Sequence, residues 1–210
     1  MEQARAVACR IHPMEGHAGR RVPLPSDEGG IAKRSRTIAL AAAAGLALFV
    51  PAARAADPGT AHARIADASG KEIGVVQFRD TPNGVIVHAE FTALPPGGHA
   101  FHVHAVGKCE PPTFDSAGGH FDPENHQHGF AVDGGWHAGD LPNVTAPADG
   151  KVTIDVLAAE LSVADGDKKM LDADGASVVV HEAVDDYTAQ PAGNAGKRIA
   201  CGVVQAGPAK

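Results

Sequence analysis

The sequence predicts an all-β domain of about eight strands, built as a sandwich or barrel. Short runs of alternating or β-branched residues recur from Thr60 onward, and turn residues separate them. About 150 residues follow position 55, which is enough for one hydrophobic core. The whole chain has one Trp, one Tyr and seven Phe, so we expect a core mainly of Val, Ile, Ala and Leu.

The predicted strands are separated by recognisable turns. Residues 68–71 join the first two strands, and Asn83-Gly84 is a strong hairpin signal between the next two. Residues 94–98 (LPPGG) break the chain before a run rich in Phe, Val and His. The expected strands are 61–67, 73–80, 85–94, 100–106, two within 143–157 around the turn 148–150, 177–184 and 198–206.

Residues 99–140 hold seven of the twelve histidines. His102 and His104 are two apart on a predicted strand, so both side chains point to the same face and can reach one metal. The later histidines lie on a long Gly/Pro/Asp-rich loop, and a loop of that length inside a domain is functional or disordered. Imidazole nitrogen suits copper and zinc, so the pattern predicts a metal site.

The first 55 residues predict a leader rather than part of the folded domain. Lys33, Arg34 and Arg36 precede an apolar core over 38–50, and Ala53-Arg54-Ala55 predicts cleavage near 55/56. The apolar run is shorter than the roughly 20 residues that span a bilayer, although a retained anchor remains the alternative. Residues 1–32 are either an extended leader or an overcalled start. We therefore expect an exported protein, periplasmic or extracellular, with its domain at 56–210.

Removal of the leader leaves two cysteines and a strongly acidic chain. Cys109 and Cys201 form an isolated pair, and an oxidising compartment favours one disulfide over two free thiols. Residues 56–210 hold 10 Lys and Arg against 21 Asp and Glu, a formal charge of −11. That charge argues against nucleic acid or an anionic membrane as a partner. Attraction of a small anion must then be local.

Six motifs resemble the copper/zinc superoxide dismutase family, in the family's order and across most of residues 60–205. One such motif alone would be weak, but six in register are specific. They are AFHVHAVGKC at 100–109, SAGGHFDP at 116–123, HGF at 128–130, HAGDLPNVTA at 137–146, VVVHEAVDD at 178–186 and GNAGKRIACGVV at 193–204.

The resemblance implies an eight-stranded Greek-key β-sandwich, or flattened barrel, with long metal-binding and active-site loops. It implies that superoxide becomes dioxygen and hydrogen peroxide at one copper and one zinc per subunit. His120 would bridge the two metals. The implied copper ligands are His102, His104, His120 and His181, and the implied zinc ligands are His120, His128, His137 and Asp140.

The resemblance also assigns roles around the metals. Asp185 would link copper ligand His102 to zinc ligand His128, and Arg198 would hold the substrate anion beside the copper. Cys109 and Cys201 match the family's disulfide. His99 is expected to pack and form hydrogen bonds, whereas a homodimer is expected only from family habit.

Some positions depart from the family pattern. The segment between His181 and Arg198 is shorter than in animal and plant enzymes, and residues 190–192 stand where those enzymes carry steering charge. Two other classes of function are weighed against dismutation. A copper-binding or copper-delivery module would be marked by loss of a copper ligand or of Arg198, and a zinc-stabilised structural domain would not need His102, His104 and His181.

Overall fold

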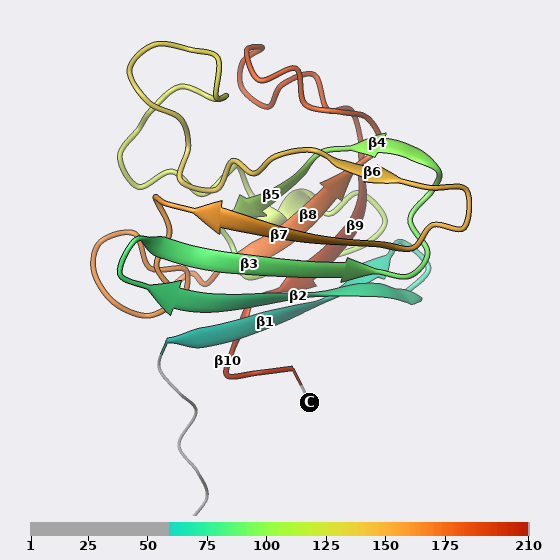
Figure 1. Ribbon diagram of the computed structural model, residues 1–210, viewed down its shortest axis with the longest axis horizontal. Coiled ribbons are helices and arrows are strands. Elements are labelled where there is room, and N and C mark those ends of the chain that lie inside the picture. Colours follow the sequence, from blue (N-terminus) through green and yellow to red (C-terminus); the bar gives the residue numbers. More distant parts are fainter. Residues whose placement is uncertain (1–58, 210) are drawn as a thin grey trace, which may run out of the picture. The chain divides into compact units, whose positions relative to one another are not determined.

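The structure is a computed structural model and describes residues 59–209, which form ten strands and one short 3-10 helix, η1 (Figure 1). The predicted leader, with its apolar core at 38–50 and cleavage near 55/56, lies outside the described residues. Within 59–209, no helix is long and apolar enough to cross a membrane. The elements are β1 Thr60–Asp67, β2 Glu72–Thr81, β3 Gly84–Phe91, β4 Gly97–His99, β5 Phe101–His104, η1 Asp115–Ala117, β6 Val144–Ala146, β7 Val152–Ala158, β8 Ser177–His181, β9 Arg198–Val203 and β10 Gln205–Ala206.

Eight of these strands form one antiparallel sheet that curls into a half-barrel. Its order is β5-β8-β9-β1-β2-β3-β7, with β10 paired to β1. Neighbours that are not consecutive in sequence, such as β3 with β7 and β5 with β8, require crossing connections of the Greek-key kind. The predicted all-β class with eight principal strands is confirmed.

Two strands differ from the predicted elements. The prediction of a break over 94–98 is wrong in part, because Gly97–His99 forms β4 and pairs with β6. Gly98 serves close approach there, since a Cβ on it would collide with the side chain of Val184. The last predicted strand is divided, because β9 ends at Val203 and β10 begins at Gln205.

The hairpin between β2 and β3 forms where the sequence predicts it. Thr81 pairs with Gly84, which leaves Pro82 and Asn83 as the two turn residues. The Thr81 hydroxyl donates to the Gly84 carbonyl at 2.8 Å. Gly84 has φ +115°, a conformation that favours glycine, but it is the first paired residue of β3 rather than a turn residue.

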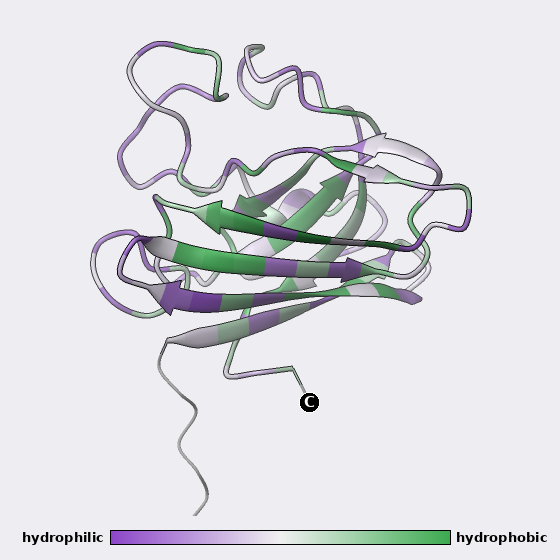
Figure 2. Cartoon of the chain, in the orientation of Figure 1, coloured by the Kyte–Doolittle hydropathy of each residue, from purple (hydrophilic) through white to green (hydrophobic). Residues whose placement is uncertain are grey.

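Burial alternates along the strands far from the histidine-rich loops but not along β5 and β8. On β3, Val85, Val87 and Ala89 are fully buried, while the residues between them are partly exposed. Every residue of β5 and of β8 is buried, because the sheet core covers one face and loops cover the other. In Figure 2 most of β8 is hydrophobic, whereas the loops above the sheet carry many hydrophilic residues. The loop-covered face of β5 and β8 is where the site lies.

Candidate metal centre

Two groups of side chains in the described part of the chain bring metal-ligating atoms within 4.8 Å of one another, and they share one member, His120. The first group is His102, His104, His120 and His181; the second is His120, His128, His137 and Asp140. Every residue that the sequence assigned to copper or zinc is therefore in the expected group.

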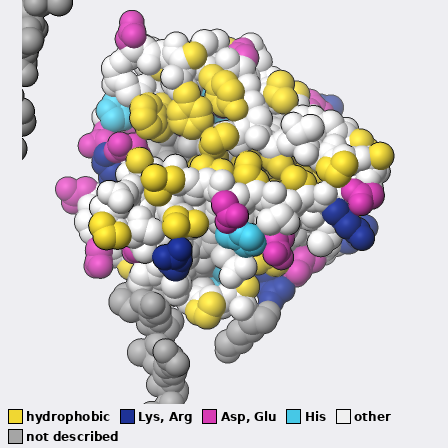
Figure 3. All heavy atoms as spheres, in the orientation of Figure 1, with side chains coloured by type: hydrophobic (Ala, Val, Ile, Leu, Met, Phe, Trp, Pro, Cys, Tyr) yellow, Lys and Arg dark blue, Asp and Glu magenta, His cyan; other side chains and the backbone are white. Residues whose placement is uncertain are grey.

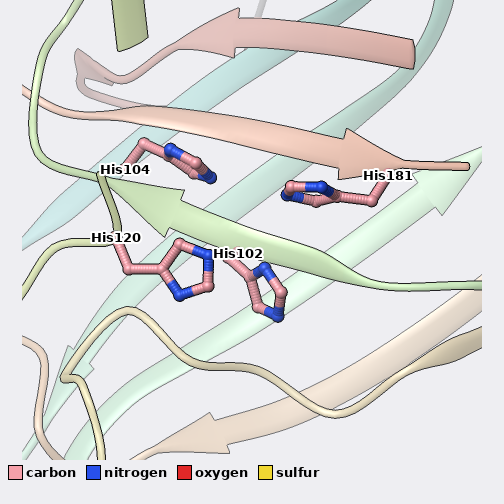
Figure 4. A group of neighbouring side chains, drawn as sticks. All are labelled: His102, His104, His120 and His181. Carbon is pink, nitrogen blue, oxygen red and sulfur yellow. The ribbon is translucent and has the colours of Figure 1, made fainter. Parts of the chain in front are cut away.

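Strand geometry places the first group. On β5, Phe101 and Val103 enter the core, while His102 and His104 turn to the opposite face. β5 pairs with β8, and His181 ends β8 beside them. His120 comes from the loop and forms an isolated bridge with His104. Figure 4 shows the four rings turned toward a common centre.

Four ring nitrogens in this group are buried without any hydrogen-bond partner. A buried polar atom left unpaired is costly, so four of them in one place require a common partner. Nitrogen ligation of this number suits copper, and the residues present fit that ion. The atoms are His102 Nδ1, His104 Nε2, His120 Nε2 and His181 Nε2.

The second group is organised around one carboxylate. Asp140 Oδ1 lies 2.8 Å from His120 Nδ1, 3.0 Å from His128 Nδ1 and 3.4 Å from His137 Nδ1. Asp140 Oδ2 accepts from the Gly129 N–H at 2.8 Å and from the His137 N–H at 3.2 Å, which fixes the carboxylate. Three imidazoles and one carboxylate fit tetrahedral zinc.

Electrostatics favour cation binding by neutral rings in the first group. Burial lowers the pKa of His120 to about 4 and that of His181 to about 3, and the neighbouring His102 adds to both shifts. Burial also places the pKa of His104 well below its usual value. Neutral imidazole is the form that binds metal, so these three rings are ready to ligate at neutral pH.

The second group carries negative charge around a protonated ring. Burial works against ionisation of Asp140, but hydrogen bonds from His120, His128 and His137 outweigh it and hold the pKa of Asp140 far below its usual range. Burial alone would lower the pKa of His128, yet Asp140 and Asp185 raise it to about 9. A divalent cation here would replace that proton as the charge partner of the carboxylates.

Asp185 contacts one histidine of each group. Its Oδ2 lies 3.0 Å from His102 Nε2, and its Oδ1 lies 3.0 Å from His128 Nε2. The carboxylate side chain is fully buried, and the hydrogen bonds from both rings lower its pKa against the opposing effect of burial. The linking position expected from the sequence is therefore present in the geometry.

Arg198 stands at the first residue of β9, paired with His181 across a β-bulge. Its guanidinium donates at 2.7 Å to the carbonyl of Phe114 and at 2.7 Å to that of Gly118. Those carbonyls belong to the loop that Cys109 fastens to Cys201 through a disulfide with an S–S distance of 1.99 Å. Burial lowers the pKa of Arg198, but guanidinium stays charged at neutral pH.

Comparison with known proteins agrees with this geometry. The family model described as copper/zinc superoxide dismutase (SODC) matches residues 72–204. The chain belongs to the copper/zinc superoxide dismutase family. It is 44% identical to superoxide dismutase [Cu-Zn] 1 of Aquifex aeolicus, over 69% of this chain and 86% of that protein.

Solved structures of a superoxide dismutase and of a SOD-like protein share the fold. Copper/zinc superoxide dismutase from Brucella abortus is 33% identical, with a TM-score of 0.58, over 70% of this chain and 99% of that one. A SOD-like protein from Bacillus subtilis, solved as a double mutant to histidine, is 41% identical with a TM-score of 0.65, over 68% and 95% of the two chains.

Two histidines of this superoxide dismutase family member lie beside the groups without joining them. The ring of His99 is buried and bonds the carbonyls of His181 and Pro95, each at 2.8 Å, in the packing role expected for it. His126 directs its Nδ1 to the Trp136 carbonyl at 3.0 Å. The group around Asp140 contains His128 and not His126, as the family spacing predicted.

Two amide side chains whose role the sequence did not predict tie the site's loops together. Asn143 Nδ2 donates to the Asp185 carbonyl at 2.9 Å, and Asn143 Oδ1 accepts from the Asp185 N–H at 2.8 Å. Gln190 makes the same pair of bonds with the backbone of His128. An amide in a loop carries no periodic pattern, so only its place in a shortened loop could have drawn attention to Gln190.

Proposed function

We propose that this superoxide dismutase family member converts superoxide to dioxygen and hydrogen peroxide at the two groups that share His120. The observation that carries the proposal is the sharing itself. His120 Nε2 lies with the unpaired nitrogens of three other imidazoles, and His120 Nδ1 lies 2.8 Å from Asp140 Oδ1. A zinc-stabilised structural domain would not need the first group.

The first group would hold copper and the second would hold zinc. Copper supplies a centre that accepts one electron from superoxide and returns one to a second superoxide, which zinc cannot do. Asp185 accepts from the Nε2 atoms of His102 and His128, and so fixes ring orientation in both groups at once.

Arg198 would bind and orient the substrate anion. Its two carbonyl contacts hold the guanidinium in place, so fixed positive charge stands at the edge of the first group. The domain around it is strongly acidic, so attraction of an anion depends on local positive charge, to which Arg198 contributes. Arg198 is therefore a local positive charge of the kind that an acidic domain needs to attract an anion.

His120 Nε2 would hold and release one of the two protons that peroxide formation needs, and water would supply the other. The atom is buried and lacks a protein partner, and burial keeps its ring neutral at pH 7. Its Nδ1 stays beside Asp140, so a proton at Nε2 would leave the ring anchored on the zinc side.

Export and assembly are further parts of the proposal. The charged and apolar order of residues 33–50 supports a signal peptide cleaved near 55/56, and the disulfide suits an oxidising compartment. A homodimer of the exported chain follows family habit, and sedimentation of the purified protein measures it.

Metal analysis combined with a superoxide assay tests the function. We expect roughly one copper and one zinc per chain, a type-2 cupric electron-spin signal, and loss of activity when copper alone is chelated. His102→Ala removes a ligand, whereas His88→Ala on β3 is its control, since the His88 ring bonds Asp155 at 2.7 Å outside both groups. Full activity with zinc alone, or copper bound without turnover, would reject the proposal.

A further inference from the structure

The side chain of Gln190 joins the two loops that build the zinc side of the site. His128 N–H donates to Gln190 Oε1 at 2.9 Å, and Gln190 Nε2 donates to the His128 carbonyl at 2.9 Å. The two residues are 62 positions apart, and the pair of bonds repeats the pattern of a β-bridge with a side-chain amide in place of a peptide group. A third bond, from Gln190 Nε2 to the Thr188 carbonyl at 3.1 Å, fixes the amide itself.

The loop that carries Gln190 is held by hydrogen bonds of its own that do not involve His128. Asp186 Oδ1 accepts from the backbone N–H groups of Thr188 at 2.9 Å and Ala189 at 2.7 Å. Asp186 Oδ2 accepts from Asn194 Nδ2 at 2.9 Å, across the same loop. The amide of Gln190 therefore projects from a rigid turn and loses little freedom when it binds His128.

The segment that carries His128 packs closely against the loop that carries Gln190. Gly129, which follows His128, has φ +103°, and a Cβ there would collide with the Tyr187 carbonyl. The Ala131 N–H donates to the same carbonyl at 3.1 Å. Figure 1 shows the two loops side by side above the strands, in yellow and red. Among residues 59–209, the His128 ring forms hydrogen bonds only with the carboxylates of Asp140 and Asp185.

We propose that Gln190 is a positioning residue that holds the backbone of His128 where its Nδ1 can ligate zinc. The inference rests on the proposed function, because it takes the second group as the zinc site. Without the two amide bonds, the segment around His128 gains alternative arrangements in the zinc-free protein. Zinc must then select the competent arrangement, and its apparent dissociation constant rises by the inverse of that arrangement's population.

The test compares Gln190→Met with Gln205→Met in copper-free protein. Methionine keeps much of the length and volume of glutamine but has no amide, and Gln205 is exposed on β10, away from the metal groups. Zinc affinity is measured by competition with a chromophoric chelator, and stability of the zinc-free protein is measured by urea unfolding. We expect the zinc dissociation constant to rise roughly 10-fold for Gln190→Met and to stay unchanged for Gln205→Met.

A role in stability alone would give a different result. It would lower the unfolding free energy with and without zinc equally and leave the zinc dissociation constant within twofold of wild type, which would overturn the proposal. Gln190→Asn, whose amide is one methylene too short to reach both backbone groups, gives the same readout should the methionine variant fail to fold. If wild type and His128→Ala bind zinc equally, the zinc site itself is misplaced, and the proposed function fails rather than this inference.

Discussion

Removing the disulfide is expected to weaken both the fold and the anion site. Cys109 and Cys201 are 92 residues apart, so the crosslink closes a loop that holds all four residues of the second metal group and two of the four in the first. In the chain-entropy account, a loop of that length stabilises the folded state by about 4–5 kcal/mol. Small domains have a total stability of about 5–15 kcal/mol, so this is a large share of it.

The same change acts on Arg198 by a local route. Cys201 is buried against Phe114 and Ala117, which belong to the loop that starts near Cys109. That loop supplies the carbonyls of Phe114 and Gly118 to the guanidinium. We therefore expect a reduced dismutation rate even at temperatures where the opened protein stays folded.

The assay uses the double variant Cys109→Ala/Cys201→Ala, loaded with both metals. Urea unfolding gives the free energy, and a superoxide assay at 25 °C gives the rate. Wild type reduced with dithiothreitol is the control, because it opens the crosslink without changing side-chain volume. If the free energy of unfolding falls by less than about 1 kcal/mol in both samples, the entropic argument is refuted. An unchanged rate would show that the two carbonyls hold Arg198 without the crosslink.

Three further predictions concern the charged and metal-ligating groups. His120→Ala is expected to lower copper and zinc occupancy together in metal analysis, and loss of only one metal would show that the bridge is misassigned. Arg198→Ala is expected to keep copper and to lower the dismutation rate roughly tenfold or more, with the larger loss at low salt, where steering is least screened. A variant rate equal to the wild-type rate at every salt concentration would place anion attraction elsewhere. For metal-free protein, the unfolding free energy is expected to peak near pH 6.5. Below that pH the unfolded chain takes up protons that buried His120 and His181 refuse until pH falls to about 4 and 3, so stability falls with pH. Above it, stability is lost as pH rises toward about 9, where folded His128 gives up a proton that the unfolded chain has already released. Urea unfolding from pH 4 to 9 measures this curve, and a steady rise across the range would contradict it.

Strand periodicity and residue chemistry predicted a metal site within residues 99–140, and the family resemblance supplied the ligand sets together with His181, Asp185 and Arg198. The two-residue spacing of His102 and His104 puts both rings on the face of β5 opposite Phe101 and Val103, and the structure brings them together with His181. The Asn83-Gly84 signal gave the β2–β3 hairpin. These features depend on local backbone geometry, which neighbouring residues determine.

Other features depend on contacts between distant segments and have no local signature. β4 forms because Gly97–His99 meets β6, although its own sequence resembles a turn. Asn143 and Gln190 act through bonds to backbone groups 42 and 62 residues away. A single polar side chain in a loop can find many partners, so its sequence position alone does not choose one.

The two metal groups are coupled through more than the shared ring of His120. Asp185 divides its oxygens between His102 of one group and His128 of the other, and Asn143 fixes the backbone of Asp185. A shift of His128 therefore moves a carboxylate that also orients a copper-side ring. Because Asp185, His102 and His128 are all buried, water cannot replace either ring as a partner of the carboxylate at low cost. The second group is thus tied to the first through two connections, the shared ring of His120 and the carboxylate of Asp185.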